Sequence, residues 1–303
     1  MQNNHKVGGQ AVLEGVMMRY QDRMAIACRR DDNSISIHSE TIKPLAKKYP
    51  VLGWPIIRGA VAFFEALVLG VRALNISAAE ALADDEEEIT AWQTFLTVVL
   101  GLGLGVGLFF ILPTYLVRFL PAWPPIWLNL IEGMIRLTIF VSYIVLISRW
   151  GDIKRFFQYH GAEHKVIYGY EHNHTFDLNH INNFSTRHPR CGTSFILTVM
   201  VVSIILFSFF GWPDLAQRIV LRLSLLPLVA GLSYEAIRYS AKSSSPLVRV
   251  MVAPGLWLQR LTTLEPDKSQ LEVALSALKA VLEHEDGQKP ACESEAEVTA
   301  DAR

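Results

Sequence analysis

Two histidines and a glutamate in the middle of the chain have the spacing of a metal site. His160, Glu163 and His164 stand in the pattern H-x-x-E-H. Residues four apart on a helix lie one above the other, so both imidazoles can bind one divalent metal ion such as Zn²⁺. The glutamate beside them is placed to act as a general base toward a water molecule. The pattern therefore predicts a metal-dependent hydrolytic site.

Zinc sites use at least three protein ligands, so a further donor must come from another segment. The candidates are His188 and Cys191 in the sequence RHPRC, Glu235 in a later apolar segment and Glu14 near the N-terminus. Arg190 or Arg238 is expected to stabilise negative charge that develops in the reaction. Two alternatives stay open. The histidines can instead bond to carboxylates such as Glu14 or Glu235 without a metal, or Cys191 can act as a nucleophile.

Long apolar segments must position these residues. The 303 residues are 51% hydrophobic and 19% charged, with a net charge of −1, whereas ordinary globular domains have roughly 25% charged residues. Residues 89–117 and 191–213 contain no charged side chain, and residues 126–147 and 215–239 contain only a few. Each segment is long enough to cross the hydrocarbon core of a bilayer, which takes about 20 residues. We therefore expect four transmembrane helices.

Two pairs of opposite charges fall inside these predicted spans. Glu132 and Arg136 are four residues apart, and Glu235 and Arg238 are three apart. Such spacings allow an ion pair on one helix face, which lowers the cost of burying each charge. We expect the first pair to form, and Glu235 to pair with Arg238 unless it binds a cation.

A fifth apolar segment, residues 51–76, carries Arg58, Glu65 and Arg72 at intervals of seven. Lysine and arginine are frequent both before it and in the loop of residues 149–192, which places both regions in the cytoplasm. An even number of spans must then separate them, so residues 51–76 are expected to lie in the interface or to re-enter. Both chain termini would be cytoplasmic, in a cell (inner) membrane.

The predicted fold is all-α: a polytopic membrane protein with about four transmembrane helices, an interfacial or re-entrant helix and a cytoplasmic His-rich loop. The segments in order are a cytoplasmic N-terminal region (1–50), the interfacial or re-entrant helix (51–76), a first transmembrane hairpin (89–148), the loop with H-x-x-E-H (149–192), a second hairpin (193–239), a cytoplasmic C-terminal region (240–286) and a disordered tail (287–303).

Composition also bears on partners. A sequence pI near 6.8 argues against nucleic acid, which favours basic domains. Three widely separated cysteines do not form a disulfide framework. The lipid bilayer is the expected environment. A helical apolar stripe, formed by Leu271, Leu275, Leu278 and Leu282, predicts an amphipathic helix that could recruit a protein partner.

Five long motifs resemble the DUF1385 family of membrane proteins. They are GGQAVLEGVMMR (8–19), YHGAEHKVI (159–167), HPRCGTSF (188–195), AGLSYEAIR (230–238) and LWLQRLTTLEP (256–266). The resemblance runs from residue 7 to about residue 278. It implies that the charged segments at the membrane boundary belong together. The family's function is unknown, and its members carry the label of predicted metal-dependent enzymes.

These observations favour a membrane-embedded metal-dependent hydrolase that acts on a lipid head group or a peptide at the cytoplasmic face. A second hypothesis is a non-enzymatic membrane scaffold or assembly factor, which needs only the amphipathic helix and the charged loop. A third is a transporter, suggested by ionisable residues inside predicted spans. The inverted internal repeat of many transporters is not visible in the sequence.

Overall fold

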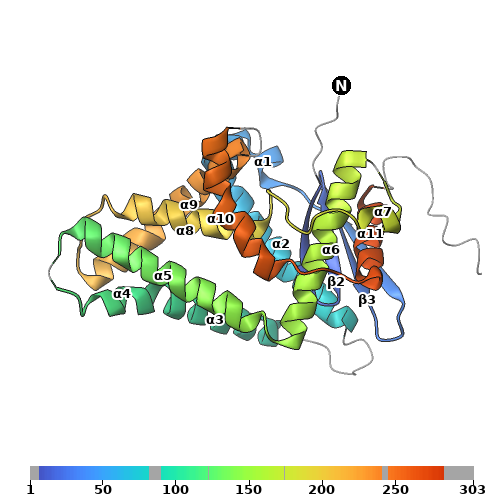
Figure 1. Cartoon of the computed structure of the whole chain (residues 1–303), viewed down its shortest axis with the longest axis horizontal. Helices are drawn as coiled ribbons and strands as arrows, with labels where there is room; N and C mark the ends of the chain where they lie inside the picture. Colours follow the sequence, from blue (N-terminus) through green and yellow to red (C-terminus); the bar gives the residue numbers. More distant parts are fainter. Residues whose placement is uncertain (1–6, 82–89, 122, 174, 241–244, 283–303) are drawn as a thin grey trace, which may run out of the picture.

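The computed structural model describes residues 7–81, 90–121, 123–173, 175–240 and 245–282. It consists of a small sheet with its covering helices at one end and an elongated helical bundle at the other (Figure 1). The predicted tail of residues 287–303 lies outside the described residues.

The N-terminal region folds into a four-stranded antiparallel sheet in the order β1-β2-β3-β4. The strands are β1 (Gly8–Val12), β2 (Gly15–Tyr20), β3 (Arg23–Arg29) and β4 (Ile35–Thr41). A two-residue turn at Leu13 and Glu14 joins β1 to β2, and Glu14 adopts a φ of +48°. The prediction of an all-α fold is therefore wrong for this region. Successive side chains of a strand point to opposite faces, and here both faces are apolar because both are covered.

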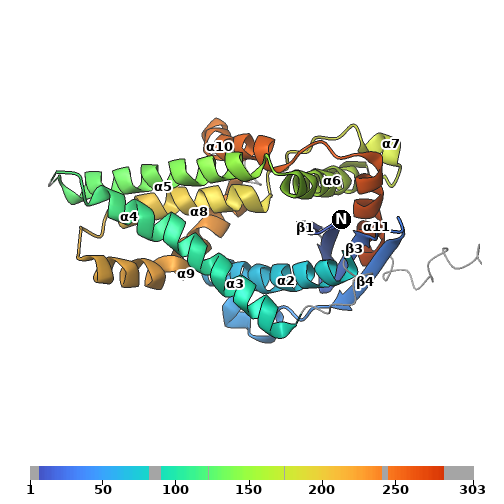
Figure 2. The same ribbon diagram turned by 90° about the horizontal axis from the view of Figure 1, so that it is seen from below.

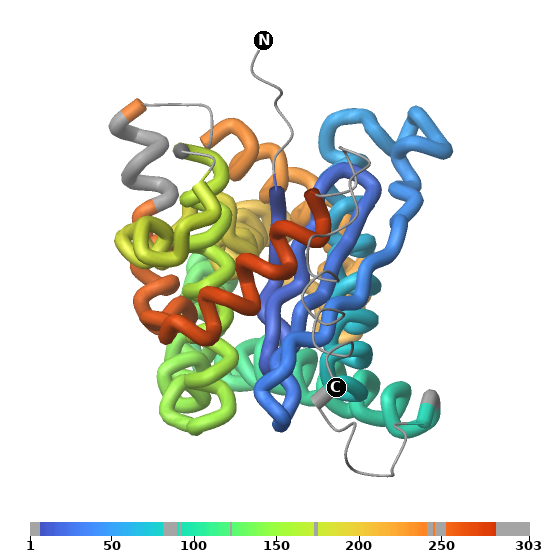
Figure 3. The backbone as a smooth tube through the Cα atoms, turned by 90° about the vertical axis from the view of Figure 1, so that its right-hand side faces the viewer, coloured from blue at the N-terminus to red at the C-terminus, as the bar shows by residue number. Residues whose placement is uncertain are grey.

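Helices cover both faces of the sheet. On one face α6 (Gly151–Asn173) and α11 (Lys268–Leu282) bury Tyr159, Val166 and Leu271 against Met18 and its neighbours. On the opposite face α2 (Ile57–Ala81) contributes Ala73, Leu69 and Ile76 to a second apolar cluster with Met17 and Ile26. Figure 3 shows α11 crossing the strands.

The predicted apolar stripe near the C-terminus belongs to α11. Leu271, Leu275 and Leu278 are at most 5% exposed and belong to the core beneath the sheet. A protein partner recruited by α11 would therefore contact the outward face of this helix.

The bundle contains the remaining long helices (Figure 2). They are α3 (Ala91–Val106), which continues through η2 (Gly107–Ile111) into α4 (Leu112–Val117), α5 (Pro125–Ile147), α8 (Gly192–Phe207), α9 (Leu215–Ser240) and α10 (Pro246–Thr262). Three short helices, α1 (Leu45–Lys48), η1 (Pro50–Gly53) and α7 (Leu178–Ile181), lie in connections.

Four helices in the described part of the chain are long and apolar enough to cross a membrane. They span Ile57–Glu80, Trp92–Val117, Pro125–Ile147 and Leu215–Ser240. This number agrees with the prediction, but the set differs. The segment that was expected not to cross, in α2, is among them. The helix expected in residues 191–213 is α8, which has only 16 residues and extends about 24 Å at 1.5 Å per residue.

The predicted ion pair between Glu132 and Arg136 is confirmed, with Arg136 Nη2 2.8 Å from Glu132 Oε1. The predicted partner of Glu235 was wrong. Its carboxylate pairs with Arg58 of α2, through two bonds of 2.6 Å, rather than with Arg238 on its own helix. In this pair between helices, Nε of Arg58 donates to one carboxylate oxygen and Nη2 donates to the other, a bidentate geometry that is stronger than a single bond.

Candidate metal centre

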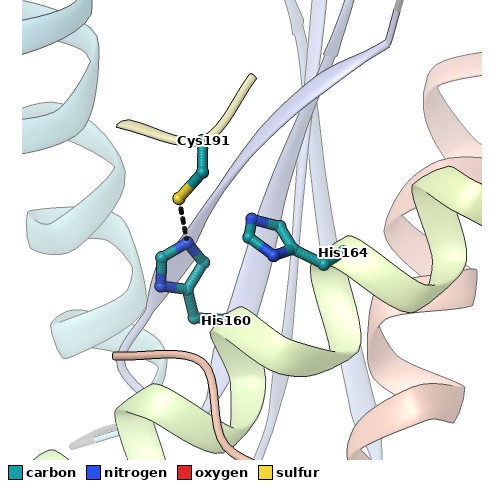
Figure 4. Close-up of side chains that lie close together, drawn as sticks. All are labelled: His160, His164 and Cys191. Carbon is teal, nitrogen blue, oxygen red and sulfur yellow. Dashed lines mark hydrogen bonds between the residues drawn. The ribbon is translucent and has the colours of Figure 1, made fainter. Parts of the chain in front are cut away.

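His160, His164 and Cys191 come together at the boundary between sheet and bundle. The two histidines project from one face of α6, one turn apart, and Cys191 lies just before α8 (Figure 4). One ligand atom from each residue lies within 4.8 Å of the other two. This group could hold a metal ion. It contains the predicted histidine pair, and the third donor is one of the four candidates drawn from other segments.

The imidazoles are oriented by backbone carbonyls. The Nδ1 atom of His160 lies 2.9 Å from the oxygen of Thr262, and Nδ1 of His164 bonds to the oxygen of Thr186. A carbonyl only accepts, so each Nδ1 carries its proton and each Nε2 keeps a free lone pair. Ligating histidines in metal sites are commonly held in this way.

Cys191 supplies the third donor from a helix start. Its Sγ atom is 3.2 Å from Nε2 of His160 and accepts the Thr193 backbone N–H at 3.4 Å. Two ligands of a tetrahedral zinc ion lie roughly 3.3–3.6 Å apart. The sulfur and the imidazole nitrogen are slightly closer than this, so a shared metal requires them to move apart by only a few tenths of an ångström. Without a metal, the thiol can donate to the same nitrogen.

A glycine makes the bond to Thr262 possible. A Cβ atom at Gly161 would lie 1.9 Å from the carbonyl oxygen of Leu264. The segment after α10 therefore passes directly over α6 at this position, and the Leu264 N–H bonds to the Phe157 oxygen at 3.0 Å. Only a residue without a side chain allows this approach, which brings the carbonyl of Thr262 to His160.

Glu163 lies beside the group. It is 5% exposed, and its Oε2 atom is 3.8 Å from Nε2 of His160. No described residue donates a hydrogen bond to its carboxylate. A Cβ atom at Gly9 would come within 2.7 Å of its side chain, so β1 packs tightly on it. Desolvation raises the pKa of Glu163 to about 7, although His160 opposes the shift.

The chain before Cys191 is held by a glutamine that the sequence analysis missed. The buried side chain of Gln259 in α10 accepts from the His188 backbone N–H and donates to the His188 oxygen and to Ser194 Oγ, each at 2.8 Å. Gln259 falls within the motif LWLQRLTTLEP, but no local pattern indicates its role. Its partners are about 70 residues away in the chain.

His188 lies beside the three-residue group, with its ring centre 5.7 Å from that of His164, but it and Arg190 pair with Glu171. The Nδ1 atom of His188 accepts the Arg190 N–H at 3.2 Å, and Nε2 lies 3.7 Å from a Glu171 oxygen. Arg190 also pairs with Glu171. Desolvation raises the pKa of Glu171, but His188 and Arg190 outweigh it and lower that pKa to about 2. Desolvation lowers the pKa of His188. The contacts among His188, Arg190 and Glu171 stabilise the turn that precedes Cys191.

The structure does not bring Glu14, Glu235 or Arg238 to the group. Glu14 bonds to Arg155 Nε and accepts from the Tyr159 hydroxyl at 3.2 Å. Arg238, like Glu235, lies near the end of α9. The alternative in which His160 and His164 bond to Glu14 or Glu235 without a metal is not what the structure contains, since their Nδ1 atoms bond to backbone oxygens.

The chain matches one protein family and one curated protein. A family model described as "Protein of unknown function (DUF1385)" matches residues 54–284. The chain belongs to the DUF1385 family. It is similar to the "Uncharacterized protein YqhQ" of Bacillus subtilis (strain 168), with 35% identity over 312 residues that cover 95% of this chain and 98% of the relative. No solved structure matches it. The family assignment predicted from the motifs is confirmed, and the matched region includes the whole three-residue group.

Proposed function

We propose that this chain is a membrane-embedded zinc-dependent hydrolase, with its site near the cytoplasmic membrane surface. The orientation of the two imidazoles carries the proposal. Both Nδ1 atoms are bound to backbone carbonyls, and Nε2 of His160 lies 3.2 Å from the Cys191 sulfur. Histidines that only pack in a hydrophobic core do not require a cysteine sulfur next to the free Nε2 atom.

The donor set fits zinc. Two imidazoles and one thiolate are ligands that Zn²⁺ accepts, and three protein ligands leave a fourth position open, as in catalytic zinc sites. Zinc, when bound, supplies Lewis acidity toward water and toward a carbonyl or phosphoryl oxygen. Glu163 is the residue that would hold and move the proton. It lies next to His160, is nearly fully buried and has no competing hydrogen bond from a described residue.

Packing supports the proposed membrane topology. Ala73 in α2 is fully buried against the sheet, which favours a position of α2 along the sheet over one across the bilayer. We infer that α2 lies at the interface, whereas α3 with α4, α5, α8 and α9 cross. α6 begins four residues after α5 ends. His160 is nine residues further, about 14 Å along the helix axis. A lipid head group or a peptide near the membrane surface can reach such a site.

Metal analysis of the purified full-length protein tests the proposal. We expect about one zinc ion per chain, and less than a fifth of that in His160→Ala, His164→Ala and Cys191→Ser. His172→Ala is the matched control, because His172 is exposed on the same helix, and it should keep the metal. Substoichiometric zinc in the parent protein that does not change in the three variants would falsify the proposal.

The variant Glu163→Gln separates an enzyme from a scaffold. It keeps the size of the side chain and removes the base, so zinc should stay bound while hydrolysis falls by 10²-fold or more. Release of head groups from phospholipids and cleavage of peptides are the activities to assay. Unchanged hydrolysis in this variant rejects Glu163 as the base. A scaffold would show no hydrolysis in either protein.

A further inference from the structure

A second cluster of charged side chains lies inside the bundle, in helices remote from the histidines. Glu132 of α5 faces Arg136 of the same helix and Arg218 and Arg222 of α9. All four residues are at most 8% exposed. One carboxylate against three guanidinium groups leaves two positive charges in excess (3 − 1 = 2). Uncompensated charge is costly within a membrane-spanning bundle and marks functional sites.

Arg218 is the least neutralised of the three arginines. Arg136 and Arg222 donate to Glu132 oxygens at 2.8 and 2.7 Å, whereas Arg218 Nη1 is 3.9 Å from the nearest one. The Nε and Nη1 atoms of Arg218 are buried without a hydrogen-bond partner. Its Nη2 atom alone donates, to the Pro213 oxygen at 3.0 Å. Asp214 is nearby but exposed, and one of its oxygens caps the Gln217 backbone N–H.

Arg218 lines a cavity of about 580 Å³ between α4, α5 and α9. The other walls are largely apolar and include Trp123, Trp212, Leu128 and Leu215. The guanidinium carbon stands 3.6 Å from the centre of the Trp212 ring. The lining residues include members of the connections α4–α5 and α8–α9, and these connections lie at the end of the bundle away from the sheet (Figures 1 and 2). Tryptophans at such an end are typical of a membrane–water interface.

We propose that this cavity binds the phosphate group of an anionic phospholipid. The guanidinium group of Arg218 keeps Nε–H and Nη1–H donors without partners, and phosphate oxygens accept such charge-assisted hydrogen bonds. The apolar walls suit the glycerol and upper acyl chains, which a free anion lacks. The proposal rests on the membrane insertion described above but not on zinc. Inorganic phosphate offers the same acceptor oxygens as the phosphate group of the lipid, so it is the second ligand to compare.

Thermal unfolding of the full-length protein in detergent, with added ligand, tests the site. Phosphatidylglycerol should raise the unfolding temperature by about 3–6 °C, while diacylglycerol, which lacks the phosphate, should not. Arg218→Gln should abolish the shift. Leu215→Trp should also abolish it by filling the cavity, and it leaves the charged cluster intact. Arg149→Gln, an exposed arginine just after the opposite end of α5, is the matched control and should respond like the parent protein.

The remaining outcomes decide the proposal. A shift with inorganic phosphate alone, lost in Arg218→Gln, supports the site with a free anion as its ligand. Equal shifts with diacylglycerol, or a phosphatidylglycerol shift that survives in both Arg218→Gln and Leu215→Trp, overturn the proposal. So does the absence of any shift in the parent protein. Zinc content should be unchanged in both variants, which separates this test from that of the metal centre.

Discussion

The α-carbon of Gly161 faces the carbonyl oxygen of Leu264 so closely that a methyl group would stand 1.9 Å from it. This contact joins α6 to the chain that leaves α10. It sets the distance between His160 and the Thr262 carbonyl, which in turn directs the Nε2 atom of His160 toward Cys191. The metal centre thus depends on a glycine that binds nothing itself.

The substitution Gly161→Ala should separate α6 from residues 262–264. We expect a loss of about 1–3 kcal/mol in the free energy of unfolding, even though alanine is the better helix former by about 1 kcal/mol. Zinc content should fall as well, because the carbonyl of Thr262 moves away from His160. Calorimetry and metal analysis measure the two effects. Gly151→Ala is the control, since nothing lies within 4 Å of a Cβ there.

The substitution Gln259→Leu should release the turn that precedes Cys191. It leaves the backbone N–H of His188 buried without a partner, which costs about 1–3 kcal/mol of stability, whereas the His188 oxygen keeps the bond from the Cys191 N–H at 3.3 Å. Zinc affinity should fall because Cys191 is no longer held near His160. The exposed Gln217→Leu is the control and should change neither quantity. Wild-type zinc affinity in Gln259→Leu would show that the turn keeps its shape without this glutamine.

The ion pairs of Glu171 should make stability depend on pH. The folded pKa of about 2 lies below the ordinary value of 4.5, so the ionised carboxylate stabilises the fold above pH 4.5. This contribution is lost as the pH falls toward 2. Glu171→Gln should therefore lower stability at pH 7 by about 1–2 kcal/mol, after allowance for solvent screening at this half-buried position. Near pH 2–3 the two proteins should converge. A stability difference that is the same at pH 7 and pH 3 would contradict the assignment.

Removal of the Glu235 carboxylate should affect helix packing and not the metal. Glu235→Ala breaks both bonds to Arg58 and should lower stability by about 1 kcal/mol. Zinc content should remain that of the parent protein. The charge-reversed pair Arg58→Glu with Glu235→Arg should regain part of the lost stability. A fall in zinc content on Glu235→Ala would instead restore this residue to the list of ligands.

Local sequence patterns were sufficient to predict part of the structure of this protein. The spacing of His160 and His164 places both rings on one helix face in any context, because the helical repeat is a local property. Segments without charge are long enough to indicate membrane helices from length alone. The pair of Glu132 and Arg136 follows from the same repeat. The strands of the N-terminal sheet were not predicted, because both faces of β2 and β3 are buried and their apolar side chains therefore do not alternate with polar ones.

Tertiary structure decided the rest. Cys191 was one of four candidate donors, and only the tertiary fold, in which α10 packs against both α8 and α6, brings it to His160, 31 residues away. The carbonyl of Thr262 comes from 102 residues away. The sequence is compatible with a bond from Glu235 to a metal, to Arg238 or to Arg58. The packing of α2 on α9 selects Arg58. Such choices depend on which distant segments bury one another, and no local repeat encodes that pairing.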